Sequence, residues 1–376
     1  MDREKKEERT KRNLSLDLAR CVALFAVIMI HISDEFVSSY KLSSLEFYIG
    51  TALDGVSRLG VPLFVMISGS LFLDERRTVK VKKLYFKNIR SLIGLLLIWS
   101  ALYSGVFNVI LPVLSGKAVS VRDFINDWAL GHYHMWYLYM IIGLYVITPF
   151  LREIVKKRNK QLVLLFIGLA LMVQFSIPVI RALANFADVF AYAETLIEQF
   201  RIHFLFGYTT YYLAGWYIVH IGIEKKKRRV LYCLSALSLL GVIVYTSLTH
   251  DYSNAFSNLN IFIFLYASGV FVLLNNVMKG SISDGLRKVL VKVSKMSFGI
   301  YIIHPLLITI MEHILPYHGM PLLYMLVLYV IVFILSFVCC SILSRIRGCV
   351  CRSECETMSA EWMSDVFVRG NGFRKS

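Results

Sequence analysis

The stretch LSLDLARCVALFAVIMIHISD, residues 14–34, decides the fold expected for this chain. It is long and apolar enough for a membrane-spanning helix, which needs about 20 residues, yet it carries Asp17, Arg20 and His31. Arg20 and His31 are eleven residues apart. They therefore share one helix face, about 16 Å apart along the axis. Because ionisable groups in hydrocarbon are costly without a partner or a polar cavity, this face is a candidate functional site. The alternative, which stays open, is that Asp17 and Arg20 form an ion pair at the cytosolic membrane surface.

Composition predicts a polytopic helical membrane protein. The 376 residues are 57% hydrophobic and only 18% charged, with a mean hydropathy of +0.62, which is unlike a soluble domain. The formal net charge of +16 would suit a nucleic-acid-binding protein, but the basic residues gather in alternate loops, as membrane topology requires. The seven cysteines form neither a disulfide framework nor a zinc pattern. We therefore expect no nucleic acid, no metal and no resident cofactor.

Apolar length and intervening turns predict about ten membrane-spanning helices. The expected spans cover residues 14–32, 45–73, 89–111, 135–154, 162–180, 204–221, 230–248, 261–277, 293–315 and 322–343. The second span is long and contains Gly60 and Pro62, which should loosen or kink it. We thus expect an all-α membrane domain over residues 14–347. A basic cytosolic segment, residues 1–13, should precede it, and a cytosolic tail without an assigned role, residues 348–376, should follow it.

The charges of the loops predict that both termini are cytosolic. Alternate loops are rich in Lys and Arg, at residues 76–90, 152–160, 225–229 and 279–292. By contrast, the stretches THDYSNAFSN (249–258) and MEHILPYHGM (311–320) contain neither. Since cytosolic loops carry the excess of basic residues, an even number of spans with both ends inside fits this pattern.

Three further sets of polar residues lie within the expected spans and are candidates for substrate binding. Asp54 and Arg58 are one helical turn apart, and so are Tyr301 and His304 in the stretch SFGIYIIHPLL (297–307). Trp136 follows His132 and His134 at the start of the fourth span. Each set has a structural alternative. Asp54 and Arg58 would be a buried pair that packs helices, His304 a hydrogen-bonded core residue, and Trp136 part of an interfacial aromatic belt.

These residues carry a resemblance to the acyltransferase 3 family of integral-membrane acyltransferases. The pattern of Arg20, ten residues and His31 occurs together with VPLFVMISG (61–69), HMWYLYMIIGLYVITP (134–149) and FGIYIIHP (298–305). The chain is most similar to the branch of surface-polysaccharide O-acetyltransferases, over about residues 14–347. The resemblance implies about ten helices, acyl-CoA as the co-substrate that donates the acyl group, and a sugar hydroxyl as acceptor. It also implies that Arg20 and His31 are the functional Arg and His.

Acyl transfer from a thioester to a hydroxyl requires a base for the hydroxyl proton, and a neutral imidazole is suited to that role. We expect His31 to be this base. Arg20, near the cytosolic face, is expected to hold a CoA phosphate or a pantetheine carbonyl by charge-assisted hydrogen bonds. The basic loop at residues 76–90 lies on the same side and would suit the nucleotide end of CoA. The alternative is that the basic residues of this loop only reflect its position on the cytosolic side of the membrane.

Two other classes of function stay open. A transporter of a small molecule such as an amino acid would also use charges at the membrane midplane, although the two halves of the chain show no internal repeat. A non-catalytic scaffold would leave the shared face of Arg20 and His31 without a role. The expected partners are acyl-CoA, a surface or lipid-linked glycan and membrane lipids. The expected location is the cell membrane, as a multi-pass protein of a bacterial plasma membrane.

Overall fold

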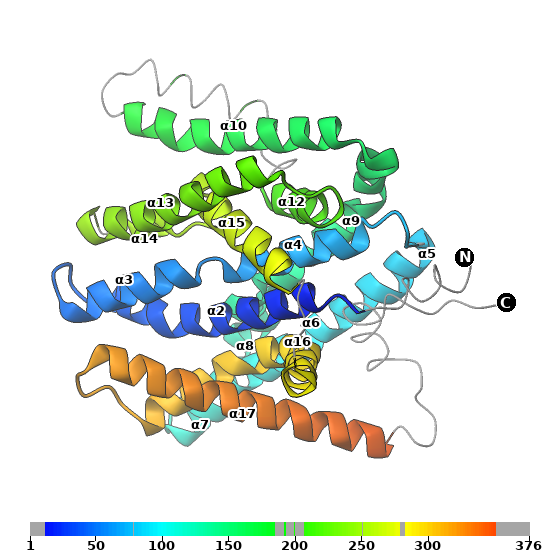
Figure 1. Ribbon diagram of the computed structural model, residues 1–376. Coiled ribbons are helices and arrows are strands. Elements are labelled where there is room, and N and C mark those ends of the chain that lie inside the picture. Colours follow the sequence, from blue (N-terminus) through cyan, green and yellow to red (C-terminus); the bar gives the residue numbers. More distant parts are fainter. Residues whose placement is uncertain are drawn as a thin grey trace.

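A computed structural model describes residues 12–77, 79–184, 192, 199, 207–249, 251–278 and 283–350. Regular structure in these residues is entirely helical, which confirms the predicted all-α class. The helices lie side by side, with α10 at one edge and α17 at the other (Figure 1). Most of the predicted N-terminal segment and of the predicted tail lies outside the described residues.

Helices cover most of the described residues of all ten predicted spans, while residues 204–206 of the sixth span lie outside the described residues. The long elements are α2 (Leu14–Ser39), α3 (Leu45–Ser57), α4 (Gly60–Phe72), α6 (Arg90–Gly105), α9 (Trp136–Val155), α10 (Lys160–Ala184), α12 (Tyr208–His220), α13 (Lys225–Thr249), α15 (Ile261–Val277), α16 (Asp284–Ile314) and α17 (Pro321–Val350). Short elements connect them: α5 (Val81–Lys83), α7 (Leu111–Leu114), α8 (Val121–Leu130), α14 (Tyr252–Ala255), the π-helical η1 (Leu84–Ile89) and η2 (Val106–Ile110), and the 3₁₀ turns η3 (Tyr133–Met135) and η4 (Lys156–Arg158).

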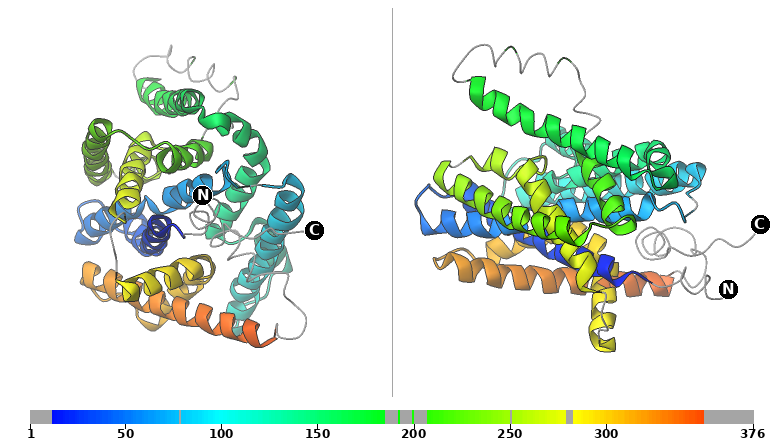
Figure 2. Two further views of the ribbon diagram at one scale, coloured as in Figure 1. Left: turned by 45° about the vertical axis from the view of Figure 1, so that its right-hand side comes forward. Right: turned by 45° about the horizontal axis from the view of Figure 1, so that its top comes forward.

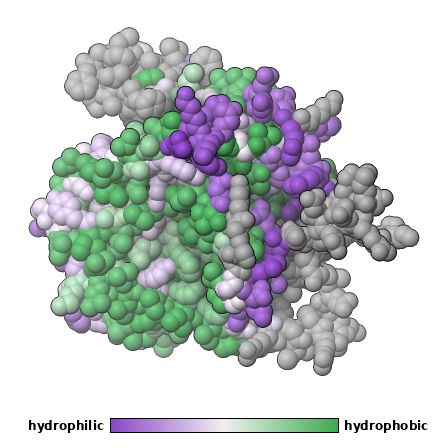
Figure 3. Space-filling view, in the orientation of Figure 1, coloured by the Kyte–Doolittle hydropathy of each residue, from purple (hydrophilic) through white to green (hydrophobic). Residues whose placement is uncertain are grey.

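In the described part of the chain, seven helical segments are long and apolar enough to cross a membrane. Helices α12 and α15 are shorter than this, with 13 and 17 residues, and α10 is considered for this number only over Lys160–Gln174. Ten spans and two cytosolic termini therefore stay predictions. The outer surface fits a membrane protein, since hydrophobic residues cover most of the face in Figure 3. Hydrophilic residues gather in the upper and right-hand part of this view.

Helix α2 is the central element of the fold. The side chain of Asn13 caps it by accepting hydrogen bonds from the backbone N–H groups of Ser15 and Leu16. It packs against α3, α4, α15, α16 and α17, and it lies between the green and the orange helices in the left view of Figure 2. Most of its apolar residues are buried on several sides. The polar residues of α2 that are thus held inside the protein are Ser15, Asp17, Arg20 and Ser33.

The second predicted span is broken, as Gly60 and Pro62 indicated. Helix α3 ends at Ser57 and α4 begins at Gly60, with Arg58 and Leu59 between them. Pro62 lies in the first turn of α4, where its missing N–H costs no helical hydrogen bond. The break places Arg58 at a helix end inside the bundle.

Helices α4 and α12 pack backbone against backbone. A Cβ atom added to Gly69 would collide with the backbone of Tyr212, and one added to Gly215 would collide with the backbone of Met66. Small residues allow this close approach, which is a common way to pack helices within membranes.

Candidate functional site

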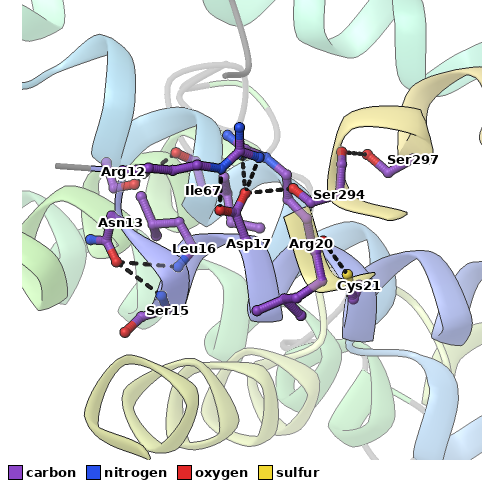
Figure 4. A network of polar contacts seen from close by, with 12 residues as sticks. Arg12, Asn13, Ser15, Leu16, Asp17, Arg20, Cys21, Ile67, Ser294 and Ser297 are labelled. Carbon is purple, nitrogen blue, oxygen red and sulfur yellow. Dashed lines mark hydrogen bonds and ion pairs between the residues drawn. The ribbon is translucent and has the colours of Figure 1, made fainter. Parts of the chain in front are cut away.

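A buried network of charges lies at the N-terminal end of α2 (Figure 4). Asp17 is 1% exposed and Arg20 is 3% exposed. Arg12 donates two hydrogen bonds to the Asp17 carboxylate, at 2.5 and 2.7 Å, and Arg20 Nη1 approaches Asp17 Oδ1 at 3.3 Å. The hydroxyl of Ser294, on α16, donates to the same oxygen at 2.6 Å. One carboxylate thus faces two guanidinium groups, which leaves an excess of one positive charge among these three side chains.

Four histidines gather near the other end of the membrane-embedded part of α2. The ring of His31 lies 5.2 Å, between ring centres, from the ring of His304 on α16 and 5.2 Å from that of Tyr133 in η3. The ring of His134 lies 6.1 Å from that of His304, and its Nδ1 is 2.9 Å from Nδ1 of His132. His134 and His304 are fully buried and His31 is half-buried. No spacing or pattern in the sequence predicts that His134 lies beside His31 and His304.

The backbone of α16 is opened at this cluster. Pro305 has no N–H, so the carbonyl of Tyr301 lacks its usual helical donor. One residue further on, the Tyr103 hydroxyl donates to the Ile302 carbonyl at 2.7 Å and accepts from the Leu306 N–H at 3.3 Å. The Tyr103 hydroxyl thus bridges the Ile302 carbonyl and the Leu306 N–H, which are one helical turn apart. The insertion of a side chain into the helical ladder is a recognised cause of local helix opening.

The two ends of the site face the same helix, α16. Asp17 contacts Ser294, and His31 lies beside His304, so α2 and α16 run parallel. Between these contacts is a mainly apolar pocket lined by Val27, Val61, Phe64, Tyr137, Ser297, Phe298 and Tyr301. Val27 shares the α2 face of Arg20 and His31, seven residues after the first and four before the second. The pocket therefore lies between the charge network and the histidines.

Arg58 bridges two helices near His31. It donates to the buried carboxylate of Asp54 and, at 2.9 Å, to the carboxylate of Asp34 on α2. Its guanidinium also lies over the ring of Phe256 and is close enough to interact electrostatically with His31. The predicted partnership of Asp54 and Arg58 is thus present, with Asp34 as a third member.

The loop after α4 is tied to α9. Arg152 donates to the carbonyls of Phe72, Asp74 and Arg77, at 2.5, 3.1 and 2.7 Å. Burial alone would raise the pKa of the Asp74 carboxyl, but the hydrogen bonds that Arg76 donates bring it below its usual value. The Arg76 side chain remains largely exposed. This loop therefore presents cationic groups at the surface.

The structure brings together most of the predicted site residues. Tyr301 is buried beside the histidines, and its hydroxyl donates to the His134 carbonyl at 2.5 Å. Trp136 is separate from them, because its ring packs against Tyr208 and is partly exposed. Within the described residues, no cluster of three or more His, Cys, Asp or Glu side chains has the arrangement of a metal site.

A helical bundle with apolar membrane-length helices and buried polar residues beside an internal pocket defines an integral-membrane protein. A family model described as "Acyltransferase domain" matches residues 13–345, nearly the whole chain. The chain therefore belongs to the acyltransferase 3 family and is a membrane acyltransferase. No curated protein and no solved structure gives a match.

Proposed function

We propose that this protein transfers an acyl group, acetyl in the simplest case, from acyl-CoA to a hydroxyl of a surface or lipid-linked polysaccharide. The single observation that carries the proposal is that Arg20 and His31 both lie beside α16, with a small, mainly apolar pocket between the two contacts. In this proposal an extended acyl donor lies along the face of α2 that carries both residues. Its charged end would lie at the arginines and its thioester near the imidazoles.

The charge network supports an anionic donor. Arg12 and Arg20 carry two positive charges and Asp17 carries one negative charge, so the N-terminal end of α2 attracts negative charge. On the predicted topology this end faces the cytosol, where acyl-CoA is found. The exposed Arg76 adds positive charge outside the membrane on the same predicted side. In this proposal Arg20 binds a phosphate or carbonyl of the donor, and the loop binds the nucleotide end.

His31 is proposed as the general base. The hydroxyl of the acceptor gives its proton to a ring nitrogen of His31 while its oxygen attacks the thioester carbonyl, and the C–S bond then breaks. The thiolate leaves with the proton that His31 received, so the imidazole is neutral at the start and at the end. Arg58, Asp54, Tyr301 and His304 surround this step as substrate-binding candidates. Trp136 stays a predicted contact for substrate at the edge of the bundle.

The proposed location is a bacterial plasma membrane, with the acceptor glycan approaching from the outer side. Of the alternatives, transport of an amino acid gains no support from the family match. The direct test uses membranes that contain the protein and its native glycan, supplied with acetyl-CoA radiolabelled in the acetyl group. Label should enter the polysaccharide and be released by mild base, as expected for an ester. A transporter would move its solute without any thioester and would leave the glycan unlabelled.

A further inference from the structure

We propose that His304 is a positioning residue for His31. In the reacting arrangement, once the His31 ring has turned toward His304, Nε2 of His304 accepts a hydrogen bond from one ring N–H of His31, which leaves the other ring nitrogen of His31 free to accept the hydroxyl proton. The inference rests on the proposed role of His31 as the base. It gives His304 a task of its own, distinct from general contact with substrate.

The hydrogen bond of Nδ1 fixes the tautomer of His304. Its Nδ1 lies 3.1 Å from the carbonyl oxygen of Ile300, one turn earlier in α16. A carbonyl can only accept, so Nδ1 must carry the hydrogen, and Nε2 of the neutral ring must then carry a lone pair. Nε2 of His304 is buried and has no hydrogen-bond partner among the described residues. A buried acceptor without a hydrogen bond costs free energy, so a hydrogen bond from a nearby donor to Nε2 of His304 is favourable.

The sequence explains why the ring takes this orientation. Pro305 follows His304 and deprives the Tyr301 carbonyl of its helical donor, and that carbonyl also faces the His304 ring. The inserted Tyr103 hydroxyl holds the next turn of the helix in its opened form. The carbonyls on this side of α16 therefore attract the Nδ1–H group and turn Nε2 away from the helix backbone.

The ring of His31 is placed to be the donor. Its centre is 5.2 Å from that of His304. In the neighbouring pair His132 and His134, the ring centres are 5.1 Å apart and the two Nδ1 atoms lie 2.9 Å from each other. The planes of His31 and His304 are inclined by 37°, against 65° in that pair, and the structure has no hydrogen bond between His31 and Nε2 of His304. At this separation a turn of the His31 ring brings one of its N–H groups toward Nε2 of His304. Since α2 and α16 are packed together along their length, the two rings are held at this distance by the fold.

The acceptor hydroxyl, His31 and the CoA thiolate account for every proton that moves in this step, and no further group is needed. When the hydroxyl proton reaches one nitrogen of His31, the ring becomes an imidazolium whose other N–H still donates to His304. The hydrogen bond then has a charged donor and strengthens. His304 remains neutral throughout, and the proton on His31 leaves with the CoA thiolate. Loss of one such hydrogen bond is worth about 10- to 100-fold in rate.

Two substitutions of His304 separate this role from its alternatives. His304→Gln places an amide oxygen close to the position of Nε2, so the acceptor for His31 is kept. His304→Asn places its amide only near the position of Nδ1, so it keeps the contact with Ile300 and loses the acceptor. We expect His304→Gln to retain kcat within a few-fold of the parent. His304→Asn should lose about 10- to 100-fold in kcat, with an unchanged KM for acyl-CoA, at equal amounts of folded protein.

A second measurement is independent of turnover. Protein labelled with ¹⁵N-histidine in lipid nanodiscs should show a nitrogen–nitrogen coupling between His31 and His304, assigned through its loss in His31→Gln and in His304→Asn. Equal activity of the Gln and Asn variants, equal loss in both, or the absence of this coupling in the parent would each overturn the inference. If the parent transfers no acyl group from acyl-CoA, the proposed function fails, and the coupling still decides whether His304 orients His31.

Discussion

Replacement of Arg58 by Met should destabilise the folded protein strongly, because it leaves the buried carboxylate of Asp54 without its positively charged partner. Asp54 is fully buried, and its charge is matched by Arg58 one turn later in the chain. Arg58 also contacts Asp34 at 2.9 Å, but half of the Asp34 side chain is exposed. Water can therefore replace Arg58 at Asp34 and not at Asp54.

The magnitude follows from this difference in burial. Removal of one partner of a buried ion pair costs about 3–5 kcal/mol, since the remaining charge is left in a poorly solvating environment. Loss of an exposed pair costs less than about 1 kcal/mol. We therefore expect about 3–5 kcal/mol for Arg58→Met and less than about 1 kcal/mol for the matched control Asp34→Asn. The double variant Asp54→Asn with Arg58→Met should recover most of the loss, because no unpaired charge remains.

The assay is reversible unfolding in mixed micelles with increasing sodium dodecyl sulfate, followed by the loss of tryptophan fluorescence. Acyl transfer per folded molecule is measured on the same samples. If Arg58→Met unfolds at the same detergent fraction as Asp34→Asn while transfer is lost, the reasoning is refuted. Arg58 would then contact substrate and contribute little to the fold.

Three further outcomes are expected. Arg20→Ala should weaken binding of CoA about 10- to 100-fold and leave most protein folded; calorimetry that gives parental affinity would assign Arg20 a structural role. Gly215→Ala should cost about 1–3 kcal/mol, because its Cβ would meet the facing backbone of α4, whereas Gly241→Ala, with open space around it, should be as stable as the parent. In intact cells an impermeant maleimide should label Ser253→Cys and not Lys226→Cys, and the reverse pattern would invert the predicted topology.

Much of the fold was predictable because the length of each apolar segment can be read directly from the sequence. In the part of the chain that the structure describes, the ten apolar segments are mostly helical, and the break near Gly60 and Pro62 occurs where those residues indicated it. The shared face of Arg20 and His31 also followed from helical geometry alone. Whether all ten segments cross the membrane stays a prediction, because α12 has only 13 residues and apolar composition does not reveal where a helix begins.

The composition of the site was less predictable, because it depends on contacts between distant segments. His134 lies in a turn before α9 and is fully buried beside His304, yet no periodicity connects the two. The insertion of the Tyr103 hydroxyl into α16 likewise has no signature in either segment. The one local signal was the dipeptide at His304 and Pro305, since a proline within a helix releases a carbonyl that a nearby ring can bind. Trp136 was grouped with the site from its neighbours in sequence, but its side chain packs elsewhere.

The most direct test of the central claim is the rate of acyl transfer in His31→Gln. Gln keeps a similar shape and hydrogen-bonding capacity but cannot accept a proton as imidazole does, so a general-base role predicts a loss of about 10²- to 10⁴-fold in turnover. Binding of the donor should change little, because Arg20 and the pocket are untouched. The measurement is transfer from radiolabelled acetyl-CoA to the native glycan, per correctly inserted molecule. Turnover of His31→Gln equal to that of the parent would contradict the assignment of His31 as the base.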